Sequence, residues 1–134
     1  MATSDSGLNA TGASQAITDI ISGGATVHLF GGGSTLSYTD GSTEISNKSD
    51  ASVSVAEADF TITTAASYSG TTTLENDNEL DFGSQSIGTI DDVVIQNDAN
   101  PDRAIRSDEP NDPNTTGENV TIAAGTILYE IGNA

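Results

Sequence analysis

Short runs of alternating apolar and polar residues dominate this chain. Val27 and Leu29 alternate with less apolar neighbours, and Phe60–Thr64 and Glu79–Phe82 repeat the same period of two. This spacing places apolar side chains on one face and predicts half-buried β-strands. The most apolar run, Thr89–Gln96, predicts a central strand.

A helical period occurs once, over residues 13–22. Ile17, Ile20 and Ile21 lie at i, i+3 and i+4, so they share one face of a predicted helix. Thr11 or Ser14 is expected to cap its start, and the glycine pair at 23 and 24 is expected to end it.

The remaining segments predict more short strands separated by turns. Further strands are expected at Leu36–Tyr38, Glu44–Ser46, Ser52–Val55, Thr71–Leu74, Ala104–Arg106, Asn119–Ala123 and Thr126–Ile131. Turn signals stand at Gly31–Gly33, Asp40–Gly41, Ser69–Gly70, Asn76–Asn78 and Ala124–Gly125. The segment Asn97–Asn114 is predicted to be a long polar loop with three prolines, in which Ala104–Arg106 is the only strand-like piece.

Short strands separated by turn signals about every 8–12 residues predict an all-β fold. We expect a single-domain β-sandwich of jelly-roll type with one short N-terminal helix, in which residues 1–12 form an N-terminal arm and residues 13–134 the domain. The expected core is Ile17, Ile20, Ile21, Val27, Leu29, Phe60, Ile62, Leu80, Phe82, Val93, Ile95, Ile122, Ile127 and Ile131.

The charge of the chain is strongly unbalanced. Twenty acidic residues face three basic ones, Lys48, Arg103 and Arg106, which gives a net charge of -17. High net charge with low hydrophobicity is typical of disorder, but here the acids are dispersed between β-branched runs, which favours an ordered chain. Three scattered cations cannot neutralise a phosphate backbone or bind an anionic membrane, so neither nucleic acid nor membrane is an expected partner.

Asp outnumbers Glu thirteen to seven, and Lys occurs once. At low salt this charge destabilises a compact fold by self-repulsion, whereas near-molar salt shortens the screening length to about 3 Å. The composition therefore favours a protein that works in brine, as in a halophile; an ordinary acidic protein is the alternative.

Several classes of chemistry lack their residues. The chain has no cysteine, no apolar run of about 20 residues and no basic-then-apolar leader at its start. The only histidine, His28, stands in a predicted strand and is interpreted as a packing or surface residue. Gly31–Ser34 lacks the spacing of a phosphate loop. Paired carboxylates of a glycosidase type are expected by chance among twenty acids, so we expect no enzyme and no required cofactor.

Hard cations are a further possibility, because calcium prefers carboxylate and carbonyl oxygens from loops. The acidic loops around Asn97–Asp102 and Glu75–Asp81 both offer such ligands, although neither has EF-hand spacing. Asp98 and Asp102 are the candidate metal ligands, and a solvated acidic loop is the alternative. Asn-x-Ser/Thr triplets at residues 9, 47, 114 and 119 are a weak signal for glycosylation.

The order of these segments resembles a family of small tailed-phage virion proteins, labelled tail fibre or head-decoration proteins. Ala16–Ser22 followed by Thr26–Phe30 is similar to the short helix and "VYVALY" strand of that family. Asn78–Phe82 and Ile87–Asp98 are similar to its "ADVTFP" and "WGTVTHFGIFD" strands. Gly117–Ile131 resembles its closing "V-x-A-G-D-T-x-T-I-P-A-G-x-L-x-I" segment.

The chain departs from the family pattern at three places. Ile87 replaces the usual Trp, Ala123 replaces the Pro of the closing turn, and the loop after Asp98 is longer and more acidic. These departures leave the expected fold unchanged and bear on receptor specificity.

With the acidic composition, the resemblance implies a structural virion protein of a tailed virus of a halophilic archaeon. The expected role is a capsid decoration or turret protein that assembles as a symmetric trimer or pentamer on the major capsid protein or other virion proteins. The alternatives are a tail or fibre subunit, or a carbohydrate-binding module that contacts a host-surface glycan, with calcium organising the Asp98–Asp102 loop.

The acidic composition predicts salt-dependent stability. We expect the thermal unfolding midpoint to rise by several degrees between low and near-molar KCl, because salt screens the repulsion among uncompensated carboxylates. Circular dichroism melts in KCl and NaCl measure this. A midpoint that falls or stays flat with salt contradicts adaptation to brine.

Overall fold

The structure, a computed structural model, describes residues 8–31, 36–37, 39–66, 70–107, 113–114 and 118–132, with residues 113–114 described only in their backbone. Several sequence expectations lie outside these residues. They are most of the N-terminal arm, the turn at Gly32–Gly33, Tyr38, Ser69 and much of the loop after Ser107.

Helix α1 spans Ala10–Ile21 and begins three residues earlier than expected. The side-chain oxygen of Asn9 accepts a hydrogen bond from the Gly12 N–H at 2.8 Å and caps the helix. Thr11 and Ser14, the expected caps, therefore lie inside it. Glycines 23 and 24, both with positive φ, follow the helix and end it as expected.

One antiparallel sheet has the strand order β2-β1-β6-β7, with a short strand β8 that also pairs with β6. The expectation that Thr89–Gln96 forms a central strand is confirmed, because β6 lies between β1 and β7. The strands span Ala25–Gly31 (β1), Ala51–Val55 (β2), Gly88–Asn97 (β6), Ala104–Ser107 (β7) and Pro113–Asn114 (β8).

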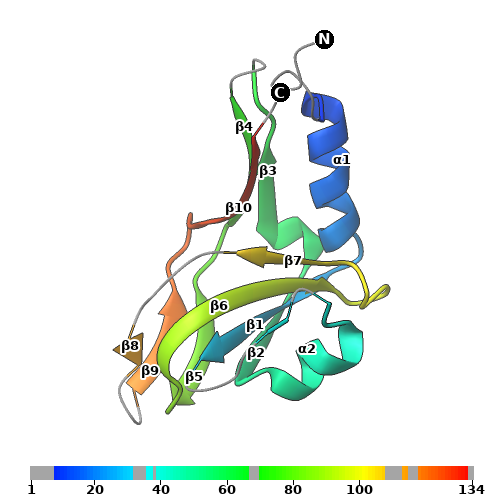
Figure 1. Ribbon diagram of the computed structural model, residues 1–134. Coiled ribbons are helices and arrows are strands. Elements are labelled where there is room, and N and C mark those ends of the chain that lie inside the picture. Colours follow the sequence, from blue (N-terminus) through cyan, green and yellow to red (C-terminus); the bar gives the residue numbers. More distant parts are fainter. Residues whose placement is uncertain are drawn as a thin grey trace.

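The other strands form a long antiparallel ribbon. β4 pairs with β10 and β5 pairs with β9, so the consecutive strands β4-β5 run beside β9-β10, and β3 pairs with the free side of β4. Figure 1 shows this ribbon descending from beside α1 past the first sheet. The strands span Phe60–Thr63 (β3), Thr71–Asn76 (β4), Leu80–Gln85 (β5), Glu118–Ile122 (β9) and Ile127–Gly132 (β10).

A second α-helix, α2, spans Ser42–Lys48, where a weak strand was expected at Glu44–Ser46. The Glu44 carboxylate accepts a hydrogen bond from the Gly41 N–H at 3.0 Å, which fixes the first turn as a helix. Ile45 is the one large apolar residue in the segment, so no period could be read from the sequence. A single 3₁₀ turn, η2 (Glu57–Asp59), precedes β3.

The main core lies between the first sheet, the ribbon and α1. The expected core is largely confirmed, with Ile62 and Ile131 only partly buried at its margin. Ile127 is the exception, since it is 42% exposed. The register of β10 against β4 shifts between Ile127 and Tyr129, which turns Leu128 into the core in its place.

Strand β1 and the second half of β6, from Asp92 to Asn97, are buried on both faces, so the expectation that β1 is half-buried is wrong. Val27 and Leu29 face the main core. On the opposite face, Phe30 and Val94 pack with Ile45 of α2 as a second cluster. Helix α2 thus covers part of the outer face of the sheet, and Figure 1 shows it beside β1 and β2.

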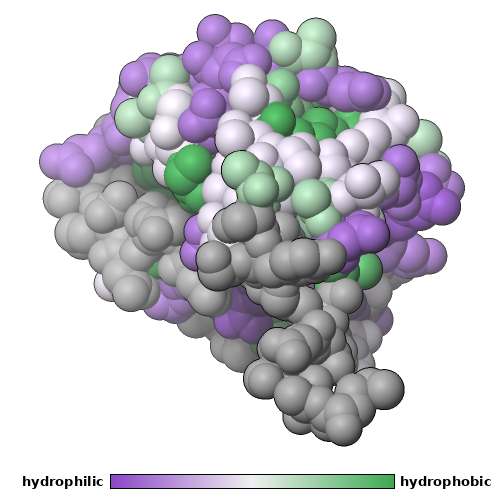
Figure 2. Space-filling view, turned by 90° about the horizontal axis from the view of Figure 1, so that it is seen from above, coloured by the Kyte–Doolittle hydropathy of each residue, from purple (hydrophilic) through white to green (hydrophobic). Residues whose placement is uncertain are grey.

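The architecture is all-β in class and sandwich-like, with antiparallel sheets and, within the described ranges, two α-helices where the sequence predicted one. Viewed from above, the described surface is hydrophilic around its periphery, with only small apolar patches (Figure 2). Among the described residues, Leu8 and Ile127 are the large apolar side chains that are exposed, and no helix has the length and apolarity to cross a membrane.

Gly31 ends β1 at a position that no side chain can occupy. A Cβ there would lie 2.1 Å from the carbonyl oxygen of Thr89 on the adjoining strand. The register between β1 and β6 shifts between Phe30 and Gly31, which brings the two backbones together at this point. Glycine is therefore required here because the backbones of two strands come close together. In the sequence the same residue was read only as a turn signal.

We predict that Gly31→Ala lowers the free energy of unfolding by about 1–3 kcal/mol or more, because the clash is with backbone that cannot rotate away. Gly41→Ala is the matched control. Its φ is -98° and a Cβ there meets nothing closer than 3.5 Å, so we expect a loss below about 1 kcal/mol. Denaturant unfolding measures both, and equal losses would contradict the close-approach argument.

Candidate functional site

His28 lies in β1 on the face that α2 covers and is buried between two polar partners. Its Nδ1 is 2.8 Å from the Ser49 hydroxyl, and its Nε2 is 2.9 Å from the side-chain oxygen of Gln96. The Gln96 amide nitrogen donates to the Pro101 carbonyl at 2.9 Å, which fixes the amide orientation. Neutral His28 therefore carries its proton on Nε2 and donates it to Gln96.

Burial lowers the pKa of His28 below its ordinary value of 6.5, although the hydrogen bond with Gln96 and the charge of Asp98 act in the opposite direction. The Ser49 hydroxyl can donate to Nδ1 or to the Ala51 carbonyl, which is 3.1 Å away. When this hydroxyl donates to Nδ1, both ring nitrogens have hydrogen-bond partners in the neutral state. His28 is a packed, hydrogen-bonded residue of the sheet, which agrees with its interpretation from the sequence.

A hollow of about 230 Å³ that combines apolar and charged groups lies on the outer face of the first sheet. It lies between Leu36, Ser37 and Asp40, α2, β6 and β7. Its apolar lining comes from Leu36, Ile45, Val94, Ala104 and Ile105, and its polar lining from Ser37, Asp40 and Arg106.

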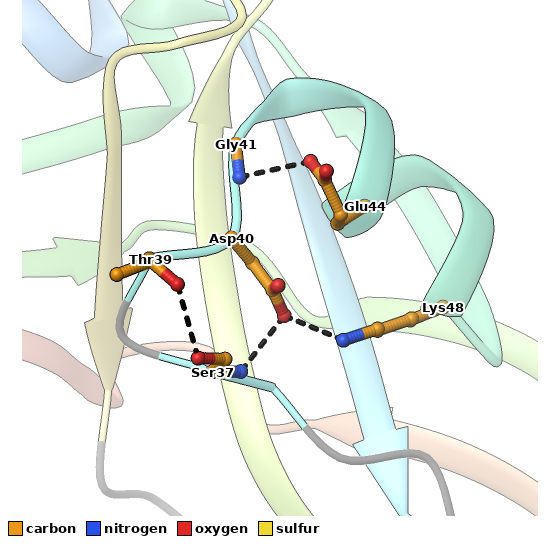
Figure 3. Close-up of polar contacts among 6 residues, drawn as sticks. All are labelled: Ser37, Thr39, Asp40, Gly41, Glu44 and Lys48. Atoms are coloured by element: carbon orange, nitrogen blue, oxygen red, sulfur yellow. Dashed lines mark hydrogen bonds and ion pairs between the residues drawn. The ribbon is translucent and has the colours of Figure 1, made fainter.

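Asp40 is held at the rim of the hollow by two donors (Figure 3). Lys48, from the last turn of α2, donates to Asp40 Oδ2 at 2.7 Å, and the Ser37 N–H donates to the same oxygen at 2.7 Å. The hydrogen bond from Lys48 is the main cause that holds the pKa of Asp40 below its usual range, and the Ser37 N–H adds to it. Asp40 is therefore a fixed carboxylate.

Arg106 stands on the β7 side of the hollow. Its Nε and Nη2 lie 2.7 and 2.6 Å from Asp92 Oδ1 on β6, so the guanidinium is held against the sheet. The Asp92 side chain is 10% exposed, whereas that of Arg106 is 52% exposed. Arg106 therefore combines a fixed position with guanidinium surface that faces solvent beside an apolar lining.

The two candidate metal ligands, Asp98 and Asp102, contact different protein donors. The Thr26 hydroxyl donates to Asp98 Oδ1 at 2.7 Å, and the Ser42 N–H at the start of α2 lies 3.4 Å from Asp102 Oδ1. Each carboxylate thus connects its loop to another element. A calcium ion at this loop stays a prediction from the sequence.

The second acidic loop, around Glu75–Asp81, makes similar local contacts. The Thr61 hydroxyl donates to Asp77 Oδ1 at 2.5 Å, and the Gly83 N–H donates to Asp81 Oδ1 at 2.8 Å. A hollow of about 130 Å³ between β2 and this loop has Asp59 and Glu79 in its lining. In the described part of the chain, no three acidic or histidine side chains are grouped as ligands of one metal ion.

The residues of the larger hollow did not stand out in the sequence. Lys48, Asp40 and Arg106 were noted for charge or as a turn signal, and they meet only because α2 folds against β6 and β7. The one usable sequence signal was the small number of basic residues. Of the three in the chain, Arg106 lines the hollow and Lys48 borders it.

We predict that protonation of His28 destabilises the fold. Because its folded pKa is lowered, the unfolded chain binds the proton more readily, so stability falls as the pH drops below about 6.5 towards the folded pKa. Each unit of lowering corresponds to about 1.4 kcal/mol. An NMR titration of this single histidine gives the pKa, and unfolding across the same window gives the stability. The variant His28→Gln should lose this pH dependence; a folded pKa above 6.5 would contradict the argument.

Comparisons of the chain with protein-family models, with curated proteins and with solved structures find no match. The resemblance to tailed-phage virion proteins therefore rests on the quoted segments alone.

Proposed function

We propose that this protein is a non-enzymatic structural component of a tailed virus particle, a capsid decoration or turret protein that assembles as a symmetric homo-oligomer on the head. The particle of a halophilic archaeal virus is the proposed location. The jelly-roll type of sandwich belongs to the same proposal, and the long ribbon of β4-β5 beside β9-β10 supports it.

One observation carries the proposal. The segments that resemble the virion family are neighbours in the fold: β1 pairs with β6, and β5 pairs with β9. The end of the similar helix is tied to the end of the similar β6 strand through the Asn97 side chain, 2.9 Å from the Ile20 carbonyl. Segments scattered along the sequence thus lie together in one core, as expected if they were inherited as a structural unit.

The polar chemistry of the described core favours a structural role. The buried amides of Asn76 and Asn97 and the ring of His28 are each occupied with hydrogen bonds to neighbouring elements. Strong net negative charge on a small stable domain would keep a densely covered particle soluble in brine. A tail or fibre subunit is the second location compatible with the same fold.

The proposal is tested by the copy number of the chain in purified virus particles. Quantitative mass spectrometry with the major capsid protein as internal standard is expected to give a ratio near that of a surface-covering protein. A far smaller ratio would assign the chain to the tail, and its absence from particles would overturn the proposal. Light scattering of the recombinant chain in near-molar KCl should show a trimer or pentamer, and a monomer would contradict self-assembly.

A further inference from the structure

The hollow beside α2 has a lining that distinguishes it from the rest of this acidic chain. Arg106 lines it and is paired with Asp92, and Lys48 borders it through its ion pair with the lining residue Asp40. The charges of the lining and of its direct ion-pair partners therefore balance, although the whole chain carries -17. The other acidic residues of the chain outnumber the one remaining cation, Arg103.

This charge arrangement decides between classes of ligand. An anion would gain little from cations that are already paired, and the field of the whole chain would repel it. A cation would find that the acids of the hollow already have partners. A neutral ligand is not repelled by the acidic chain and needs no unpaired charge in the hollow. It binds if it offers hydrogen-bonding groups to the rim and apolar surface to the lining.

The lining supplies both kinds of contact. Arg106 offers N–H donors on a side chain that is 52% exposed, and the fixed Asp40 carboxylate offers acceptors. Between them, Ile45 and Val94 form a buried apolar base that belongs to the second hydrophobic cluster. A saccharide ring offers both kinds of surface, because its hydroxyls lie on its edge and its C–H groups on its face.

We propose that this hollow is a binding site for a single neutral saccharide unit. Its volume of about 230 Å³ is below the roughly 300–1,000 Å³ typical of sites for larger ligands, so it admits one ring rather than a chain of sugars. The site lies beside the helix and not at the calcium-binding loop expected from the sequence. It requires no assumption about where the protein resides.

A site of this size binds one sugar weakly, because few groups are buried. Repetition would compensate, since linked sites can exceed the affinity of one by about 10²–10⁴ when a glycan presents several matching ends. This last step rests on the proposed homo-oligomer, whereas binding of one sugar by one chain does not. Sugar binding by one chain and assembly into the homo-oligomer can therefore be tested and refuted separately.

The experiment is a titration of the isotopically labelled full chain, in near-molar KCl, with glucose, galactose, mannose and N-acetylglucosamine. Glucuronate and glucosamine serve as charged counterparts. We expect at least one neutral sugar to shift the backbone amide signals of Ile45, Ala104 and Arg106 in a saturable way. Neither charged sugar is expected to bind more tightly than that neutral sugar.

Two variants and a control locate the binding. Ala104→Leu adds volume inside the hollow without changing charge, and Arg106→Gln removes the exposed guanidinium; each should weaken binding at least tenfold. Arg103→Gln removes the third cation, outside the lining, and should leave binding unchanged. If Arg106→Gln unfolds because Asp92 loses its partner, Ala104→Leu decides alone.

The proposal is overturned if no neutral sugar gives saturable shifts at these amides, or if Ala104→Leu binds as well as the natural chain. Tighter binding of glucuronate or glucosamine would overturn the neutral-ligand assignment. A monomeric chain that still binds a neutral sugar would support this site while contradicting the proposed assembly.

Discussion

The buried side chain of Asn97 is the contact on which the arrangement of helix and sheet depends. Its amide nitrogen donates to the carbonyls of Ile20 and Ser22, both at 2.9 Å, and its side-chain oxygen accepts from the Asn100 N–H at 2.8 Å. The end of α1, the end of β6 and the following loop therefore meet at one amide. Each donor or acceptor left unsatisfied there would cost about 1–3 kcal/mol.

Asn76 plays the corresponding part in the ribbon. Its amide nitrogen donates to the carbonyls of Asn78 and Ala123, and its side-chain oxygen accepts from the Thr126 N–H at 3.1 Å. It thereby ties the bend between β4 and β5 to the turn between β9 and β10. Asn76 therefore holds the break between β4 and β5 next to the break between β9 and β10.

The hollow and His28 are consequences of burying both faces of the first sheet. Because β1 and β6 face the main core on one side, their other face needs a separate cover, which α2 supplies through Ile45. A helix of seven residues covers only part of that face. The uncovered part beside β7 is the hollow, and the covered part holds His28 in an environment that lowers its pKa.

The sequence alone determined the class of the fold, most strand positions and eleven of the eighteen buried residues of the main core. A period of two and a single helical stripe depend only on local spacing. The sequence did not show the second helix, the exposure of Ile127 or the roles of Asn76 and Asn97, which read as turn residues. Those depend on a capping contact, a register shift and hydrogen bonds between residues up to 77 positions apart. The hollow likewise exists only in the folded chain. Its charged residues come from a turn, a helix and two strands that are distant in sequence, and only tertiary packing brings two of the scarce cations to one neutral place in an acidic protein.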